Sequence, residues 1–147
     1  MDTQGRRATT LVRIATVYLL FGLAVGMYVG ISGQFAFISA HSHVSLVGWT
    51  TMALVGLAYL ALPACERSRL AAVHFWLHNV GLPVMLGGLM FKAAGRDTAE
   101  PFVALGSALV LVAMLMFTIN VFVNGAVESR LRAASPSRAA RESDPAS

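Results

Sequence analysis

Charged side chains are scarce in this sequence. Soluble globular domains carry about 25% charged residues, whereas this chain of 147 residues carries 12%. Three stretches contain none at all: Arg13 to Glu66, Arg69 to Lys92, and Glu100 to Glu128, ends excluded. Because a helix needs roughly 20 apolar residues to cross a bilayer, the first stretch accommodates two spans and the others one each. The lack of charge therefore excludes a soluble domain and predicts an integral membrane protein.

Cysteine is almost absent, since Cys65 is the only one in the sequence. A single cysteine excludes a disulfide framework, a cysteine-pair zinc site and covalent haem attachment through Cys-x-x-Cys-His. The first apolar segment follows three arginines, as in a signal peptide. It is longer than a typical signal-peptide core and lacks a small-residue cleavage site, so we expect it to be retained as a helix.

The apolar segments predict an all-α integral membrane fold, a bundle of four transmembrane helices. We place them near Ile14–Ile31, Val44–Leu62, Leu70–Phe91 and Phe102–Val123. Residues 1–13 then form a cytoplasmic N-terminal segment, 14–123 the transmembrane domain and 124–147 a cytoplasmic tail. The tail is rich in Arg, Ser, Ala and Pro and has no aromatic residue beyond the last helix, a composition that favours disorder.

Basic residues are distributed unequally between the two ends of the predicted helices. With four spans, the side of the termini holds nine arginines: Arg6, Arg7, Arg13, Arg67, Arg69, Arg130, Arg132, Arg138 and Arg141. The other side holds only Lys92 and Arg96. The positive-inside rule then predicts that both termini are cytoplasmic, in a membrane of the bacterial inner type. The net charge of +4 is explained by this topology and does not indicate a nucleic-acid partner.

Small and amide side chains in the spans predict how the helices pack. Gly22, Gly26 and Gly30 lie four residues apart on one helix face, which is typical of close helix packing within a chain or between subunits. Asn120 and Asn124 in the fourth helix are predicted to form hydrogen bonds between helices.

All four histidines lie in or at the ends of the apolar segments. Ionisable residues at membrane depth are costly and indicate function, the alternative being a neutral packing role. His41 and His43, at the start of the second helix, point to opposite faces because they are two residues apart. His74 and His78, in the third helix, share one face. His43 and His78 can ligate one haem within a chain only if the second helix starts well before His41.

Two of the predicted helices carry motifs that resemble a known family. The second opens with His-Ser-His-Val-Ser-Leu-Val-Gly at residues 41–48 and ends with Tyr-Leu-Ala-Leu-Pro at 59–63. The third carries Phe-Trp-Leu-His-Asn-Val-Gly at 75–81. In this order the motifs resemble the tenth and eleventh helices of the catalytic subunit of haem–copper oxidases and nitric oxide reductases. The resemblance covers about residues 11–123, which match the C-terminal four-helix third of that subunit.

The resemblance implies that His41 and His43 bind two separate haems, one low-spin and one high-spin. The family holds its copper or non-haem iron with histidines on other helices, for which this chain has no counterpart. A complete oxidase or reductase is therefore not implied, and catalysis stays open. Because the family's helices form three arcs of four, a four-helix chain is expected to be a homo-oligomer, a trimer or a dimer.

The sequence thus predicts a membrane protein that binds haem b and acts in electron transfer, as in a respiratory chain, or in binding NO or O₂. His41 or His43 would be the axial ligand, and a partner subunit would supply the second one. Gly48, on the same face as His41, would leave room for a flat ring. Aromatic side chains would pack on that ring, or else form a belt at the membrane interface: Phe35, Phe37 and Trp49.

Two alternatives also stay open. The first is a haem or copper handling protein that helps assemble respiratory enzymes, with the histidines as successive metal stations: His41, His43, His74 and His78. No Met-x-x-Met or Cys-x-x-Cys motif accompanies them. The second is a quinol site in the third helix, lined by His74, Trp76, His78 and Asn79.

Overall fold

A computed structural model describes the backbone of residues 5–134 and the side chains as far as residue 126. Within this range there is no strand, and four helical segments are long and apolar enough to cross a membrane: Arg6–Ser32, Phe35–Ala61, Arg69–Ala93 and Asp97–Ala126. The prediction of an all-α fold with four helices of spanning length is confirmed. The tail predicted to be disordered lies outside the described residues from 135 onward.

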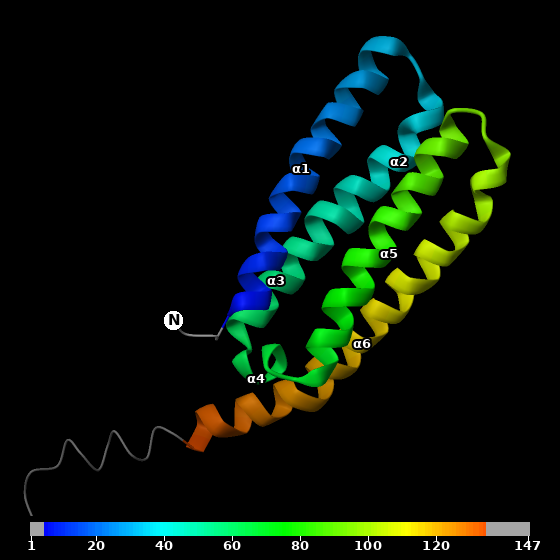
Figure 1. Cartoon of the computed structure of the whole chain (residues 1–147). Helices are drawn as coiled ribbons and strands as arrows, with labels where there is room; N and C mark the ends of the chain where they lie inside the picture. The colour runs from blue at the N-terminus through cyan, green and yellow to red at the C-terminus, as the bar shows by residue number, and fades with distance from the viewer. Residues whose placement is uncertain (1–4, 135–147) are drawn as a thin grey trace, which may run out of the picture.

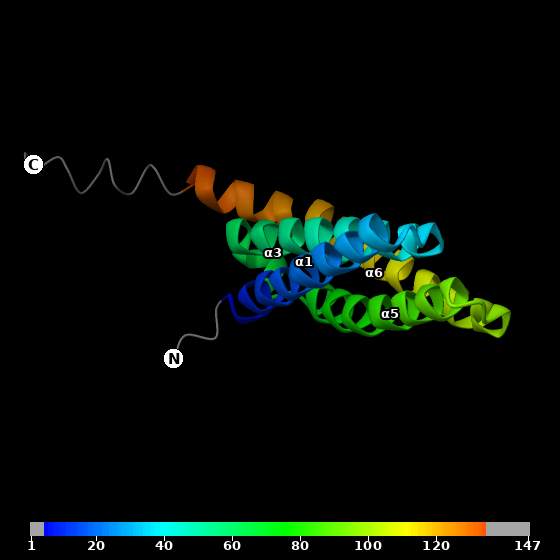
Figure 2. The same cartoon turned by 90° about the horizontal axis from the view of Figure 1, so that it is seen from above.

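Several of these segments consist of more than one element. The elements in chain order are α1 (Arg6–Ser32), η1 (Phe35–Phe37), α2 (Ile38–His43), η2 (Val44–Thr51), α3 (Met52–Ala61), α4 (Pro63–Glu66), α5 (Arg69–Ala93), η3 (Asp97–Ala99) and α6 (Glu100–Ala134). The short elements η1 and η3 are 3₁₀-helices, and η2 is a π-helix. α6 continues past the other helices at the end of the bundle where the N-terminus lies (Figure 2).

The second spanning segment starts earlier than the predicted Val44. α1 ends at Ser32 and is capped by Gly33, which adopts φ 67° and donates its backbone N–H to the Val29 carbonyl. The helix restarts at Phe35 as the 3₁₀-helix η1, which runs directly into α2. The Ser42 hydroxyl donates to the Ile38 carbonyl over 2.9 Å. His41 and His43 therefore lie about two turns inside the segment, deeper than predicted. His78 nevertheless does not pair with His43, because its Nε2 faces the Val47 carbonyl of the same segment.

The helices form two hairpins that lie side by side (Figure 1). α1 packs against η2 and α3, and α5 packs against α6. The second hairpin is closed by Gly106 of α6, where a Cβ would lie 2.6 Å from the Met85 Cα and 2.7 Å from the Gly81 carbonyl oxygen. Both atoms are backbone, so the two helix backbones are in direct contact at this glycine.

Glu66 and Arg7 join the two ends of the first hairpin. The Arg7 backbone N–H donates to the Glu66 carboxylate over 3.2 Å, and the Arg7 guanidinium donates to the Glu66 carbonyl over 3.0 Å. α1 has no side-chain cap of its own at Gly5, so the buried carboxylate satisfies one of the free N–H groups of its first turn. The sequence pattern gave no sign of this contact.

Asn120 connects α6 to the segment around α4, as predicted for an interhelical hydrogen bond. Its fully buried side chain donates to the Cys65 carbonyl over 3.0 Å and accepts from the Ser68 hydroxyl over 2.9 Å. Asn124 differs from the prediction, since its described bond goes to Asn120 within the same helix. It thereby orients the Asn120 amide rather than joining two helices.

The glycine contact between α5 and α6 predicts opposite effects for two glycine-to-alanine substitutions. Gly106→Ala should lower the free energy of unfolding by about 1–3 kcal/mol, because backbone atoms must move apart. Gly87→Ala in α5 is the matched control, since no atom of the described residues lies within 4 Å of its Cβ position. It should raise stability by about 0.5–1 kcal/mol through helix propensity. Thermal unfolding in detergent measures both, and equal effects would contradict the contact.

Candidate functional site

The His41 ring contacts two glycines of α1: it bonds to the carbonyl of Gly22 and packs against Gly26. Its Nδ1 lies 3.0 Å from the Gly22 carbonyl oxygen, and a Cβ on Gly26 would lie 2.7 Å from its Cε1. Because a carbonyl oxygen only accepts, we assign the ring proton to Nδ1 and the lone pair to Nε2. Gly30 has no atom of the described residues within 4 Å of its Cβ position. The predicted close packing is thus confirmed at Gly22 and Gly26, within one chain.

The room predicted beside Gly48 is filled by the chain itself. A Cβ on Gly48 would lie 2.8 Å from Cγ of Tyr18, so the flat ring at this glycine is a tyrosine of α1. Trp49 packs against the apolar core, and Phe37 meets Tyr28 edge-on with ring centroids 5.6 Å apart. The expectation of an open space for a cofactor ring at Gly48 is therefore corrected.

His43 is half-buried and stands outside this glycine contact. Its Nδ1 lies 2.8 Å from the Ser39 carbonyl oxygen, one turn earlier in the same helix. Because this carbonyl oxygen can only accept, we assign the ring proton of His43 to Nδ1, which leaves a lone pair on Nε2. His43 has no other hydrogen bond within the described part of the chain. Its Nε2 is therefore available to a ligand.

A π-helix, η2, begins directly after His43. Its residues are Val44–Thr51, and within it the Thr50 hydroxyl donates to the carbonyl of Ser45, five residues earlier, over 3.0 Å. π-Helical turns are rare and concentrate at functional sites. The sequence predicts a regular α-helix here, because hydrophobic residues suit α-helical and π-helical turns equally well.

His74 and His78 lie inside the bundle, between the two hairpins. They share one face of α5, as predicted, with ring centroids 5.4 Å apart, and neither is exposed. The His78 Nε2 lies 3.3 Å from the Val47 carbonyl oxygen in η2. His74 lies between the rings of Tyr59 and Phe117, at 5.8 and 5.6 Å. Both nitrogens of His74 and Nδ1 of His78 lack a hydrogen-bond partner among the described residues.

The other members of the predicted quinol site do not join this pair. Trp76 is 67% exposed on the outside of α5, and the Asn79 amide donates to the Phe75 carbonyl of its own helix. Within residues 5–126, no group of three or more His, Cys, Asp or Glu side chains is arranged to hold a metal ion. No family model matches the sequence, and neither a curated protein nor a solved structure is significantly similar to it.

The buried pair predicts an unusual response to losing a histidine. In metal-free protein, His74→Leu should raise the free energy of unfolding by about 1–3 kcal/mol, because two unpartnered polar atoms leave the core. His78→Leu is the matched control on the same face, and it also loses the bond to Val47, so its gain should be smaller. Unfolding in detergent with a chelator measures both. Greater destabilisation by His74→Leu than by His78→Leu would contradict this assignment.

Proposed function

We propose that this chain is a multi-pass membrane protein that binds haem b, with His43 as an axial ligand. The observation that carries the proposal is the state of the His43 ring, whose Nδ1 is held by the Ser39 carbonyl while Nε2 is free. Histidines that ligate metals almost always donate their other ring N–H to a carbonyl or carboxylate, which fixes the tautomer. The His-x-His resemblance and the π-helix that follows His43 support the same site.

His43 fits a haem better than His41 does. A porphyrin needs an open face on its ligand, and the face of His41 is closed by the glycines of α1 and, a few residues further along, by Tyr18. His43 is outside that contact. Two neighbours of His43 along the helix are exposed, Ser39 and Leu46, the latter to 62%, so this side of the helix is open. We therefore assign His41 to helix packing and His43 to the ligand.

A haem at His43 would lie on the outside of the hairpin, so a second chain can reach its other side. This supports the homo-oligomer, a dimer or trimer, in which the partner supplies the second axial ligand. Bound haem would supply reversible one-electron transfer, or a free coordination position for NO or O₂. The chain itself contributes the imidazole and an apolar surface, and we assign no catalytic residue to it.

The proposed orientation places both termini in the cytoplasm of a cell with a bacterial-type inner membrane. Five of the six arginines with described side chains belong to the first half of α1, the segment after α4 and the start of α5: Arg6, Arg7, Arg13, Arg67 and Arg69. Figure 1 shows the start of α1, α4 and the start of α5 at one end of the bundle. Lys92 and Arg96 lie at the opposite end. This asymmetry favours the first end as the cytoplasmic one.

The second candidate function is copper or haem handling for respiratory enzymes. It is favoured by the three unpartnered nitrogens of His74 and His78, which are buried beside one another. Imidazole nitrogens suit copper and zinc as well as haem iron. Elemental analysis of the purified protein separates the candidates, since copper or zinc without iron favours metal handling.

The haem proposal predicts different results for the two neighbouring histidines. After reconstitution with haem, the unmodified protein should give a haem b pyridine-haemochrome spectrum. His43→Ala should bind about tenfold less haem or even less than that, because it lacks the axial ligand. His41→Ala should keep its haem while becoming less stable, and Ser42→Ala, exposed between them, is the control for both. No haem in the unmodified protein, or its loss from His41→Ala alone, would contradict the assignment.

The orientation predicts where a C-terminal reporter becomes active. Green fluorescent protein fused after Ser147 should fluoresce, whereas alkaline phosphatase fused there should stay inactive, because both would remain in the cytoplasm. The reverse pattern would contradict the proposed topology. Fusions at Arg96, between the last two helices, provide the matched control and should behave in the opposite way.

A further inference from the structure

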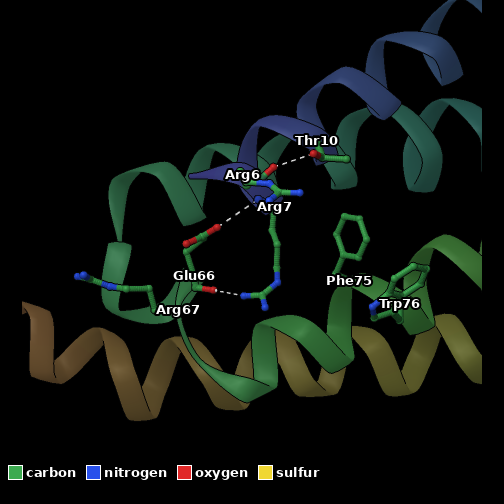
Figure 3. A pocket seen from close by; sticks show the side chains of 7 residues that line it. All are labelled: Arg6, Arg7, Thr10, Glu66, Arg67, Phe75 and Trp76. Atoms are coloured by element: carbon green, nitrogen blue, oxygen red, sulfur yellow. Dashed lines mark hydrogen bonds between the residues drawn. The ribbon is translucent and has the colours of Figure 1, made fainter. Parts of the chain in front are cut away.

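A second feature of the molecule is a basic cavity at the end of the bundle where the N-terminus lies. It has a volume of about 600 Å³ and is bordered by three elements: the start of α1, the segment after α4, and the second turn of α5 (Figure 3). Arg6 and Arg7 come from α1, Arg67 follows α4, and Phe75 and Trp76 come from α5. The four histidines are not part of its lining.

The charges around this cavity favour an anion. Three arginines and one carboxylate, Glu66, line the cavity, and that carboxylate accepts the backbone N–H of Arg7 rather than a guanidinium. The Nε–H of Arg67 donates to the Pro63 carbonyl over 3.3 Å. No arginine in the described part of the chain forms a salt bridge. The guanidinium of Arg6 has no hydrogen-bond partner among the described residues, and Arg7 uses one N–H group on the Glu66 carbonyl. Most of the N–H donors of Arg6 and Arg7 are therefore free to bind oxygen atoms.

The opposite wall of the cavity is aromatic and continues into an apolar stripe. Phe75 and Trp76 stand edge-to-face with ring centroids 5.5 Å apart. Val73, Trp76 and Val80 recur at helical spacing on the outside of α5, with exposed fractions of 44, 67 and 51%. An anion bound at the arginines would thus lie next to an exposed apolar track along the helix.

We infer that this cavity binds the phosphodiester headgroup of an anionic phospholipid, with an acyl chain along Val73, Trp76 and Val80. Guanidinium groups recognise phosphate through paired N–H donors. Basic pockets between helices on the cytoplasmic side bind such headgroups, and tryptophan is typical of this depth. The apolar stripe selects a lipid over a soluble phosphate. The inference rests on the proposed membrane insertion and is independent of haem binding.

Trp76 can serve as a fluorescent probe of this site, because the sequence has only one other tryptophan, Trp49. In a Trp49→Phe background, Trp76 is the only one left, and brominated lipids quench its fluorescence on contact. Full-length protein in phosphatidylcholine nanodiscs should be quenched more strongly by brominated phosphatidylglycerol than by brominated phosphatidylcholine at the same mole fraction. Soluble glycerol phosphate should not compete with the brominated lipid.

Two sets of variants complete the test. Arg6→Gln with Arg67→Gln should reduce the preference for phosphatidylglycerol by about fivefold for each arginine removed. Arg7 is left intact because it holds Glu66. Lys92→Gln with Arg96→Gln, at the other end, is the matched control and should leave the preference unchanged. Equal quenching by both lipids, an unchanged preference in the arginine variant, or competition by glycerol phosphate would overturn the lipid site. Failure to insert into nanodiscs would instead contradict the membrane proposal.

Discussion

Backbone carbonyl oxygens lie within hydrogen-bond distance of a ring nitrogen of three of the four histidines, and these bonds fix how the histidines are presented in the bundle. A polar group among apolar helices has no water to bond, so most such groups bond to the chain itself; His74, whose two ring nitrogens have no partner among the described residues, is an exception. His41 uses the Gly22 carbonyl, His43 uses that of Ser39, and His78 uses that of Val47. Since a carbonyl oxygen accepts a hydrogen bond from the protonated ring nitrogen, the other nitrogen of a neutral imidazole carries a lone pair. This is the ring state that the proposed haem site uses at His43.

Glycine decides which of these imidazoles remains accessible. At Gly26 and Gly48 the space of the missing side chain is filled by rings of the same chain, those of His41 and Tyr18, and at Gly22 it is filled by Ser45 and Val44. These contacts hold the first hairpin together and close the face that the sequence assigned to a cofactor. His43 is left on the outer side, where only another molecule can complete a site. In the proposed haem protein, a partner subunit therefore supplies the second axial ligand.

The features that could be predicted from the sequence depend on composition and helical period. Charge-free stretches predicted the four helices, and four-residue spacing predicted the shared face of His74 and His78 and the packing at Gly22 and Gly26. Other features depend on contacts between distant residues, which no local pattern reveals. The Glu66 cap on α1 joins positions 59 residues apart, and Tyr18 reaches Gly48 from a different helix. The π-helix was also missed, because its sequence is equally suited to an α-helix.

We propose that His43 is the histidine of this chain whose ring nitrogen binds the haem iron. The most direct test is the optical and electron paramagnetic resonance spectrum of a His41→Asn, His74→Leu, His78→Leu variant, in which His43 is the only histidine left. We predict that this variant, reconstituted in membranes, still binds haem b through a nitrogen ligand and loses it when His43→Ala is added. Absence of haem from the triple variant, while the unmodified protein binds it, would contradict the account.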